Sequence, residues 1–116
     1  MPARTVLIHY TLKQGCDGLI TGICKVEMII FEASSLKEKR MVVKSIIGRI
    51  KSRFNVSVSE IGYHELWGRS EIGFACVSTQ AKHANQMLDS IISFIEKDGR
   101  VEMINKKTEY VSMFEE

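Results

Sequence analysis

The chain has 116 residues, enough for one domain, and a domain of this size buries about two-thirds of its unfolded surface without disulfides or metals. Its composition is 45% hydrophobic and 26% charged with a single proline, which excludes disordered, collagen-like and low-complexity chains. No apolar run approaches the ~18 residues of a membrane-spanning helix. The three cysteines form no C-x-x-C pair, which argues against a disulfide scaffold or a zinc ribbon and favours a reducing compartment, the cytoplasm.

Basic residues are concentrated in one segment of the chain. Residues 37–53 contain seven basic side chains and one acid, so this segment has a net charge of +6 in a chain whose net charge is +2. The basic residues are Lys37, Lys39, Arg40, Lys44, Arg49, Lys51 and Arg53. Such a segment indicates contact with a polyanion, and the alternative interpretation is a solvated helix face.

The first half of the chain predicts a strand followed by a helix. Residues 1–18 are hard to place, although Thr5–Tyr10 has strand character. From Gly22, apolar and polar residues alternate with the period of a half-buried strand. Ser35 and Glu38 have the spacing of a capping box, and an amphipathic helix follows to about Phe54. We expect its apolar face to comprise Leu36, Val43, Ile47, Ile50 and Phe54, beside a stripe formed by Lys37, Arg40, Lys44 and Lys51.

The second half predicts two strands, a helix and a last strand. Residues 56–61 and 72–76 alternate in hydropathy, and a loop rich in large side chains, 62–69, separates them. A second helix follows a cap at Ser78 or Thr79, with Ala84, Leu88, Ile91 and Ile95 on one face. We expect Gly99 to stop this helix in the left-handed conformation. The last strand lies within residues 101–113, and we expect a break near Asn105.

This order of elements is that of an α+β, ferredoxin-like β-α-β-β-α-β sandwich, a four-stranded antiparallel sheet with two helices on one face. Right-handed crossovers predict the strand order 4-1-3-2. The chain therefore divides into an N-terminal extension, residues 1–18, and a single domain, residues 19–116.

The other sheet face is predicted to be open. Its aromatic content is limited to Phe31 near a strand end, which argues against base stacking of the RNA-recognition type. Ile29 and Phe31 are therefore candidates for binding a partner, which could be a second copy in a homo-oligomer or another protein; the extension is an alternative cover. In the 62–69 loop, Trp67 with Arg69 could anchor a partner, or Trp67 could close the end of the sandwich.

The chain shows no pattern of a reaction. It has no nucleophile–base pairing, no metal-ligand spacing and no nucleotide-binding loop. The turn Ala33-Ser34-Ser35 lacks the arginine of an acylphosphatase phosphate cradle. Cys24 and Cys76 are expected to face the helices as small buried hydrophobes. We therefore expect no catalytic residues, no metal and no cofactor.

Several segments together resemble the YlxP-like family, domain of unknown function 503. They are Gly22–Glu27, Ser35–Arg40, Phe54–Val58, Leu66-Trp67 with Arg69, Ala75–Ser78 and Phe94–Glu96. The resemblance implies a bacterial, ferredoxin-like protein without an established activity. The family's genes often lie near those for initiation factor two and ribosome-binding factor A, which implies work on RNA or the ribosome.

The resemblance also implies an unusual N-terminus. Family members typically begin with methionine where this chain has Leu19, and bacteria can initiate at a leucine codon. We therefore expect residues 1–18 to be an upstream translation that is absent from the native protein.

Two functions remain open from the sequence. The first is a non-catalytic, cytoplasmic factor that binds RNA or ribosomal phosphates through the basic helix. The alternative is a protein-interaction or oligomerisation module that uses the open sheet face and the Trp67 loop. Neither function requires a membrane.

Overall fold

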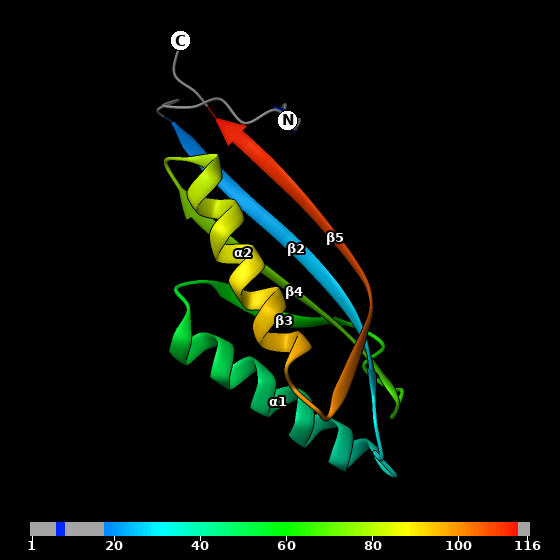
Figure 1. Ribbon diagram of the computed structural model, residues 1–116. Helices are drawn as coiled ribbons and strands as arrows, with labels where there is room; N and C mark the ends of the chain where they lie inside the picture. The colour runs from blue at the N-terminus through cyan, green and yellow to red at the C-terminus, as the bar shows by residue number, and fades with distance from the viewer. Residues whose placement is uncertain (1–6, 9–17, 114–116) are drawn as a thin grey trace.

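The computed structural model describes residues 7–8 and 18–113 and has the predicted ferredoxin-like architecture (Figure 1). Its antiparallel sheet contains the strands β2 (Leu19–Ile30), β3 (Ser57–Gly62), β4 (Arg69–Ser78) and β5 (Val101–Met113). The helices α1 (Leu36–Arg53) and α2 (Ala81–Glu96) lie on the same face of this sheet. A two-residue strand, β1 (Leu7–Ile8), pairs with the outer edge of β5.

The sheet order is β1-β5-β2-β4-β3, so the four long strands follow the predicted order. β5 is one strand, and the predicted break is a bulge. Glu27 of β2 pairs with Asn105, whereas the next residue, Met28, pairs with Met103, which leaves Ile104 as the extra residue. The rest of the expected extension strand, and most of residues 1–18, lies outside the described residues, so the proposal that the extension is not native stays a prediction.

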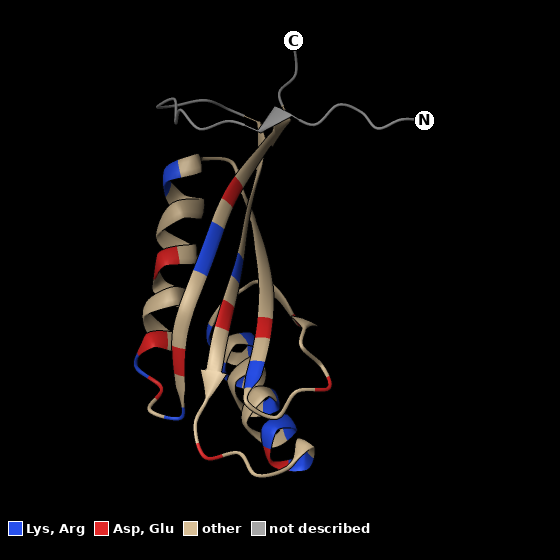
Figure 2. Ribbon diagram, turned by 90° about the vertical axis from the view of Figure 1, so that its right-hand side faces the viewer, with Lys and Arg blue, Asp and Glu red and all other residues tan. Residues whose placement is uncertain are grey.

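The hydrophobic core lies between the helices and one face of the sheet, as the alternation predicts. The buried residues include Cys24, Val26, Met28 and Ile30 from β2, Ile72, Phe74 and Cys76 from β4, and Ala84, Leu88, Ile91 and Ile95 from α2. Gly22 allows α2 to approach β2 closely, because a Cβ there would lie 2.9 Å from the Leu88 side chain. Neither helix covers the opposite face of the sheet (Figure 2).

The buried face of α1 differs from the predicted one. Val43 and Ile50 are buried as expected, but they are joined by Ile46 and Lys39. The predicted Leu36, Ile47 and Phe54 are only half-buried. The observed buried face is therefore rotated about the helix axis relative to the predicted one. The prediction was wrong because it placed every lysine of α1 in solvent.

The helix ends also depart from the predicted chemistry. Ser35 caps α1 as expected, since its Oγ accepts a hydrogen bond from the Glu38 amide at 3.1 Å. Glu38 reaches back to the Ser34 amide and hydroxyl, both at 2.7 Å, instead of to the Ser35 amide. α2 begins after Gln80, which makes no side-chain cap. α2 ends at Glu96, and Gly99 does not adopt a positive φ, so the predicted left-handed stop is wrong.

Candidate functional site

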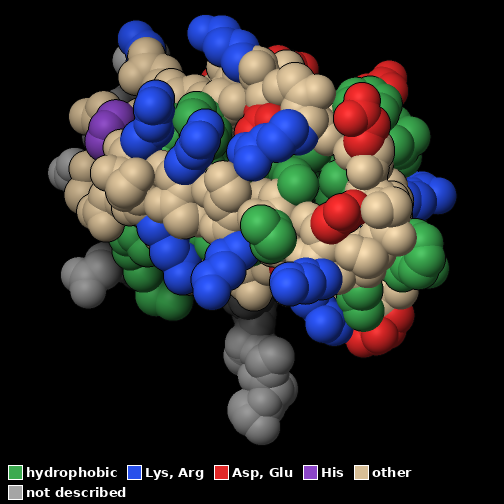
Figure 3. Space-filling model, turned by 90° about the horizontal axis from the view of Figure 1, so that it is seen from below, with side chains coloured by type: hydrophobic (Ala, Val, Ile, Leu, Met, Phe, Trp, Pro, Cys, Tyr) green, Lys and Arg blue, Asp and Glu red, His purple; other side chains and the backbone are tan. Residues whose placement is uncertain are grey.

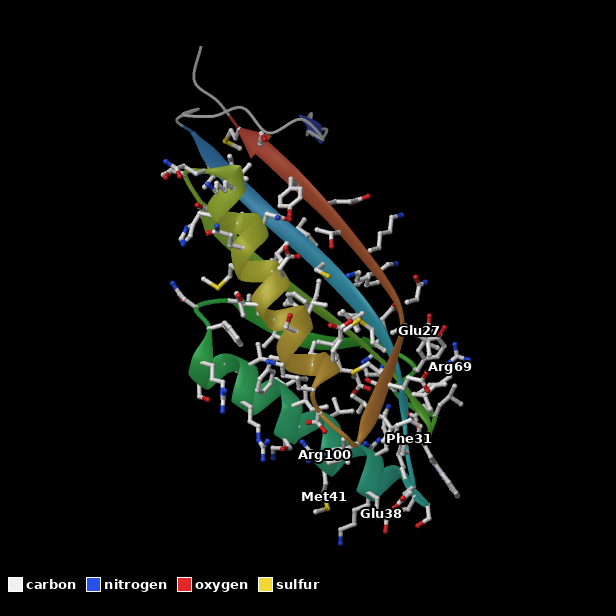
Figure 4. All side chains as sticks on the ribbon, viewed as in Figure 1. Glu27, Phe31, Glu38, Met41, Arg69 and Arg100 are labelled. Carbon is white, nitrogen blue, oxygen red and sulfur yellow. The ribbon has the colours of Figure 1, made fainter. Side chains whose placement is uncertain are left out.

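Six of the seven predicted phosphate-binding side chains are exposed along α1. They are Lys37, Arg40, Lys44, Arg49, Lys51 and Arg53. Figure 3 shows the surface seen from below, where lysine and arginine side chains spread across the face and acidic side chains lie mostly toward its right-hand end. Met41, which is 63% exposed, points outward from the same helix (Figure 4). Lys37, Arg40, Lys44 and Lys51 form one stripe away from the buried face, whereas Arg49 and Arg53 project from the side of α1 that is nearer to α2.

Among the residues that the structure describes, no carboxylate forms an ion pair with these six cations. Within the described part of the chain, the ion pairs are Lys39–Glu60, Arg69–Glu27 and Arg100–Asp98, and none of them includes the six. Arg53 has a different contact, since its guanidinium lies 5.0 Å from the centre of the Phe94 ring on α2. The surface therefore keeps its positive charge available to an external anion.

Lys39 is the exception among the seven, and its predicted role in phosphate binding is wrong. Its side chain is 0% exposed, and its Nζ lies 2.7 Å from the Glu60 carboxylate. Nζ also donates to the backbone oxygens of Tyr63 at 2.8 Å and His64 at 3.4 Å. The Ser70 hydroxyl donates to the same Glu60 oxygen at 2.7 Å. This network connects α1 to β3, to β4 and to the loop after β3, so the role of Lys39 is structural.

The network predicts a loss of stability in acid. Burial alone would raise the pKa of Glu60, but hydrogen bonds from Lys39 and Ser70 together lower that pKa below its ordinary value. The pKa of Asp98 is also lowered, chiefly by its hydrogen bond from Arg100. A carboxylate with a depressed folded-state pKa stabilises the fold above its unfolded-state pKa, and this stabilisation is lost as the pH falls through the folded-state value.

We therefore expect the free energy of unfolding to decrease below about pH 4, the ordinary range of carboxyl pKa values. Urea unfolding followed by circular dichroism at a series of pH values measures this dependence. Glu60→Gln should make the acid dependence shallower than in the natural sequence. An identical pH dependence in the two proteins would contradict the contribution assigned to Glu60.

The loop between β3 and β4, Tyr63–Gly68, presents Trp67 to solvent. Tyr63 starts it with a positive φ of 58°, and the Leu66 amide donates to the Tyr63 oxygen at 3.1 Å. Trp67 is 53% exposed, so it does not close the end of the sandwich. The loop and the sheet instead border a groove of about 650 Å³, whose walls include Ile29, Leu66, Trp67, Arg69 and Ile104.

The structure brings together three of the four predicted partner-binding residues. Ile29, Trp67 and Arg69 line this groove, where Arg69 pairs with Glu27 and stacks 5.0 Å from the centre of the Tyr63 ring (Figure 4). Phe31 is exposed but is not among the groove's lining residues. The sequence analysis missed Ile104, which reaches the groove because the bulge shifts the register of β5.

Nucleophilic and anion-binding chemistry find little support in the geometry. Burial raises the pKa of both the Cys24 and the Cys76 thiols, which disfavours the reactive thiolate. The Glu38 carboxylate accepts hydrogen bonds from Ser34 at the start of α1, and so occupies the place where an external anion would approach.

Among residues 7–8 and 18–113, no group of three or more His, Cys, Asp or Glu side chains is placed to hold a metal ion. Neither described helix is long and apolar enough to span a membrane.

Glu60 is the residue of the buried network that the sequence analysis did not single out. It lies on β3 in a run where polar residues alternate with Val58, a pattern that suggests solvent exposure. The available signal was the presence of one acid on this short strand and of seven basic residues against one acid, Glu38, on α1. That signal alone does not identify which of seven cations is buried.

Two comparisons with known proteins bear on the family of this chain. The model of a family described as "Protein of unknown function (DUF503)" matches residues 21–108. A Bacillus subtilis (strain 168) relative, named "Uncharacterized protein YlxP", is 40% identical over 89 residues, which cover 77% of this chain and 97% of the relative. The chain belongs to the DUF503 family, as the segments that resemble YlxP-like proteins predicted.

Proposed function

We propose that this protein is a non-catalytic, cytoplasmic factor that binds RNA, in particular on the ribosome, by docking the basic surface of α1 against phosphates. The observation that carries the proposal is the set of six exposed cations on one helix, none of them in an ion pair within the described residues. Phosphate contacts of this kind position a protein on nucleic acid without reading its sequence.

The geometry supports contact with the phosphate backbone of RNA over recognition of its bases. The open sheet face carries one large aromatic near a strand end, Phe31, in place of the aromatics with which RNA-recognition sheets stack bases. The exposed face of α1 combines long flexible cations with Met41 and Gly48, and it offers no aromatic ring for stacking. Affinity on this surface should therefore depend on charge density and little on sequence.

Co-sedimentation of the purified protein with ribosomes through a sucrose cushion, over a series of salt concentrations, tests the proposal. Each neutralised phosphate changes the slope of log affinity against log salt by about −0.7 to −0.9, so six contacts would give a slope of about −4 to −5. Binding that is strong at low salt and lost at high salt is the expected result. Absence of binding at low salt would contradict the proposal.

The second candidate function is a protein-interaction module, which the exposed Trp67 and its groove favour. Aromatic side chains that line such grooves are frequent anchors of protein interfaces. In the same sedimentation experiment, Trp67→Ala or Ile29→Asp should abolish association if this candidate is correct. The salt concentration should then have little effect on this association, because the contact would be mainly apolar.

A further inference from the structure

We infer that α1 binds double-stranded RNA, lying along the shallow groove of an A-form duplex so that cations on its two sides contact the phosphates of both strands. The inference rests on the proposed function, because it names the kind of RNA that the basic surface of α1 recognises. It is carried by the placement of the exposed cations on opposite sides of one helix.

The six exposed cations of α1 form two flanks. The first flank comprises Lys37, Arg40, Lys44 and Lys51, and the second comprises Arg49 and Arg53. At 3.6 residues per turn, the mean directions of the two flanks around the helix axis differ by roughly 170°. Figure 3 shows lysine and arginine side chains in two rows, above and below a mostly tan band. A single strand of RNA can follow one flank, whereas two flanks on opposite sides of the helix suit two strands.

The second flank extends toward α2. A hollow of about 440 Å³ lies between the end of α1 and α2, and its walls include Arg53, Asp89, Ser90, Ser93, Phe94 and Lys97. The Arg53 guanidinium is positioned there by its contact with the Phe94 ring, and Lys97 is exposed and in no ion pair within the described residues. Two cations against the single carboxylate of Asp89 give the hollow a net positive charge. It therefore provides the place for phosphates of the second strand.

Between the two flanks, the outer crest of α1 consists mostly of short residues. Met41, Ser45, Gly48 and Ser52 follow one another along this crest at helical spacing. A Cβ added at Gly48 would meet no atom within 4 Å, so the packing of the described residues does not require a glycine there. Glycine inside a helix lowers stability relative to alanine, and one of its uses is to let the backbone approach a ligand closely. The crest thus allows α1 to lie close to the floor of a groove while the flanks reach both of its edges.

This crest suits the minor groove of an A-form RNA duplex better than the major groove of B-form DNA. The B-form major groove is about 8.5 Å deep, and helices that bind in it read the base edges with polar side chains. The A-form minor groove is wide and shallow and displays 2′-hydroxyls. Ser45 Oγ accepts a hydrogen bond from Arg100 at 3.3 Å and keeps its own hydrogen for a 2′-hydroxyl. Ser52 Oγ donates to the Arg49 backbone oxygen at 3.0 Å and keeps its lone pairs.

Fluorescence anisotropy of the full chain with three labelled probes tests the inference. The probes are a mixed-sequence RNA duplex of about 20 base pairs, slightly longer than the ~16 that a double-stranded-RNA-binding domain spans, one of its strands alone, and the DNA duplex of the same sequence. Six contacts with the RNA duplex would give a slope of log affinity against log salt of about −5, and four contacts with the single strand would give about −3. We expect the RNA duplex to bind about tenfold more tightly than the single strand, because two further phosphates are neutralised. It should also bind more tightly than the DNA duplex, whose major groove is deep and whose minor groove is narrow.

A matched pair of variants separates the two flanks. Arg49→Gln with Arg53→Gln removes the second flank, and Lys44→Gln with Lys51→Gln removes the same charge from the first. The second-flank variant should reduce the salt slope for the RNA duplex by about 2 and leave single-strand binding unchanged. The first-flank variant should weaken the binding of both forms of RNA.

A second pair of variants tests the crest. Gly48→Leu adds bulk without charge at the centre of α1, and it should weaken binding of the RNA duplex more than binding of the single strand, which needs only the first flank. Gln86→Leu makes a comparable change at an exposed position of α2 and should leave the binding of both probes unchanged. Equal effects of Gly48→Leu and Gln86→Leu on duplex binding would contradict the close approach assigned to the crest.

The inference and the proposed function fail on different results. An RNA duplex that binds no more tightly than the single strand or the DNA duplex would overturn the inference and leave the proposed function in place. The same holds for a second-flank variant that loses duplex and single-strand binding equally. If that variant fails to fold, Arg49→Gln alone changes one exposed side chain and should reduce the duplex salt slope by about 1. Absence of binding to either form of RNA at low salt would contradict the proposed function itself.

Discussion

Lys39→Met is expected to reduce the free energy of unfolding by about 3 kcal/mol, the lower end of the range for breaking a buried ion pair. The substitution preserves most of the side-chain volume but leaves the Glu60 carboxylate without its ammonium partner at 2.7 Å. It also removes the donor to the Tyr63 and His64 oxygens. The lower end applies because the Glu60 side chain retains 17% exposure and can be partly solvated. Urea denaturation at neutral pH measures the change.

The matched control is Lys44→Met on the same helix. Lys44 is exposed and in no described ion pair, so this substitution should change the free energy of unfolding by less than about 0.5 kcal/mol. Adding Glu60→Leu to Lys39→Met should recover part of the lost stability, since an apolar pair replaces an isolated charge. If Lys39→Met and Lys44→Met behave alike, the structural role assigned to Lys39 is wrong.

Reversing three charges on α1 should abolish ribosome binding. The variant Lys37→Glu, Arg40→Glu, Lys44→Glu replaces three cations that we propose to contact phosphates by carboxylates, which repel phosphates. The variant leaves the buried Lys39 unchanged. Each lost phosphate contact should reduce the salt slope by about 1, and binding at low salt should weaken roughly 100-fold or more. The measurement is co-sedimentation with ribosomes together with a thermal melt, because these exposed side chains contribute little to stability.

A control variant with the same change in net charge separates local contact from overall charge. Lys82, Lys97 and Lys106 are exposed and lie outside α1, at the two ends of α2 and on β5. Their replacement by glutamate should reduce ribosome binding far less than the α1 reversal. Equal losses in the two variants would show that binding depends on net charge and not on the surface of α1.

Local sequence patterns were sufficient for most of the fold. The period-two alternation along β2 and β4 predicted their buried residues, because a one-residue shift of a strand would expose the whole apolar set. The spacing of Ala84, Leu88, Ile91 and Ile95 predicted the buried face of α2 for the same reason. Right-handed crossover connections then allowed one strand order, which the sheet has.

The candidate site was predictable only in part. The sequence located the basic segment and the exposed aromatic loop, since both are dense in one kind of residue. It could not separate Lys39 from its six basic neighbours. A buried lysine is recognised by its partner, and the partner of Lys39 is Glu60, 21 positions later in the chain on the strand β3. Burial without such a partner would be too costly for a charged group.

From the sequence alone follow the ferredoxin-like order of elements, the family and the concentration of positive charge in residues 37–53, because each depends on residues that are near neighbours in the chain. Tertiary structure alone decided which of those charges faces solvent, where Trp67 lies, and that Ile104 lines the groove beside it. These features arise where strands and helices distant in sequence meet, and their register is set by the packing of the whole sandwich.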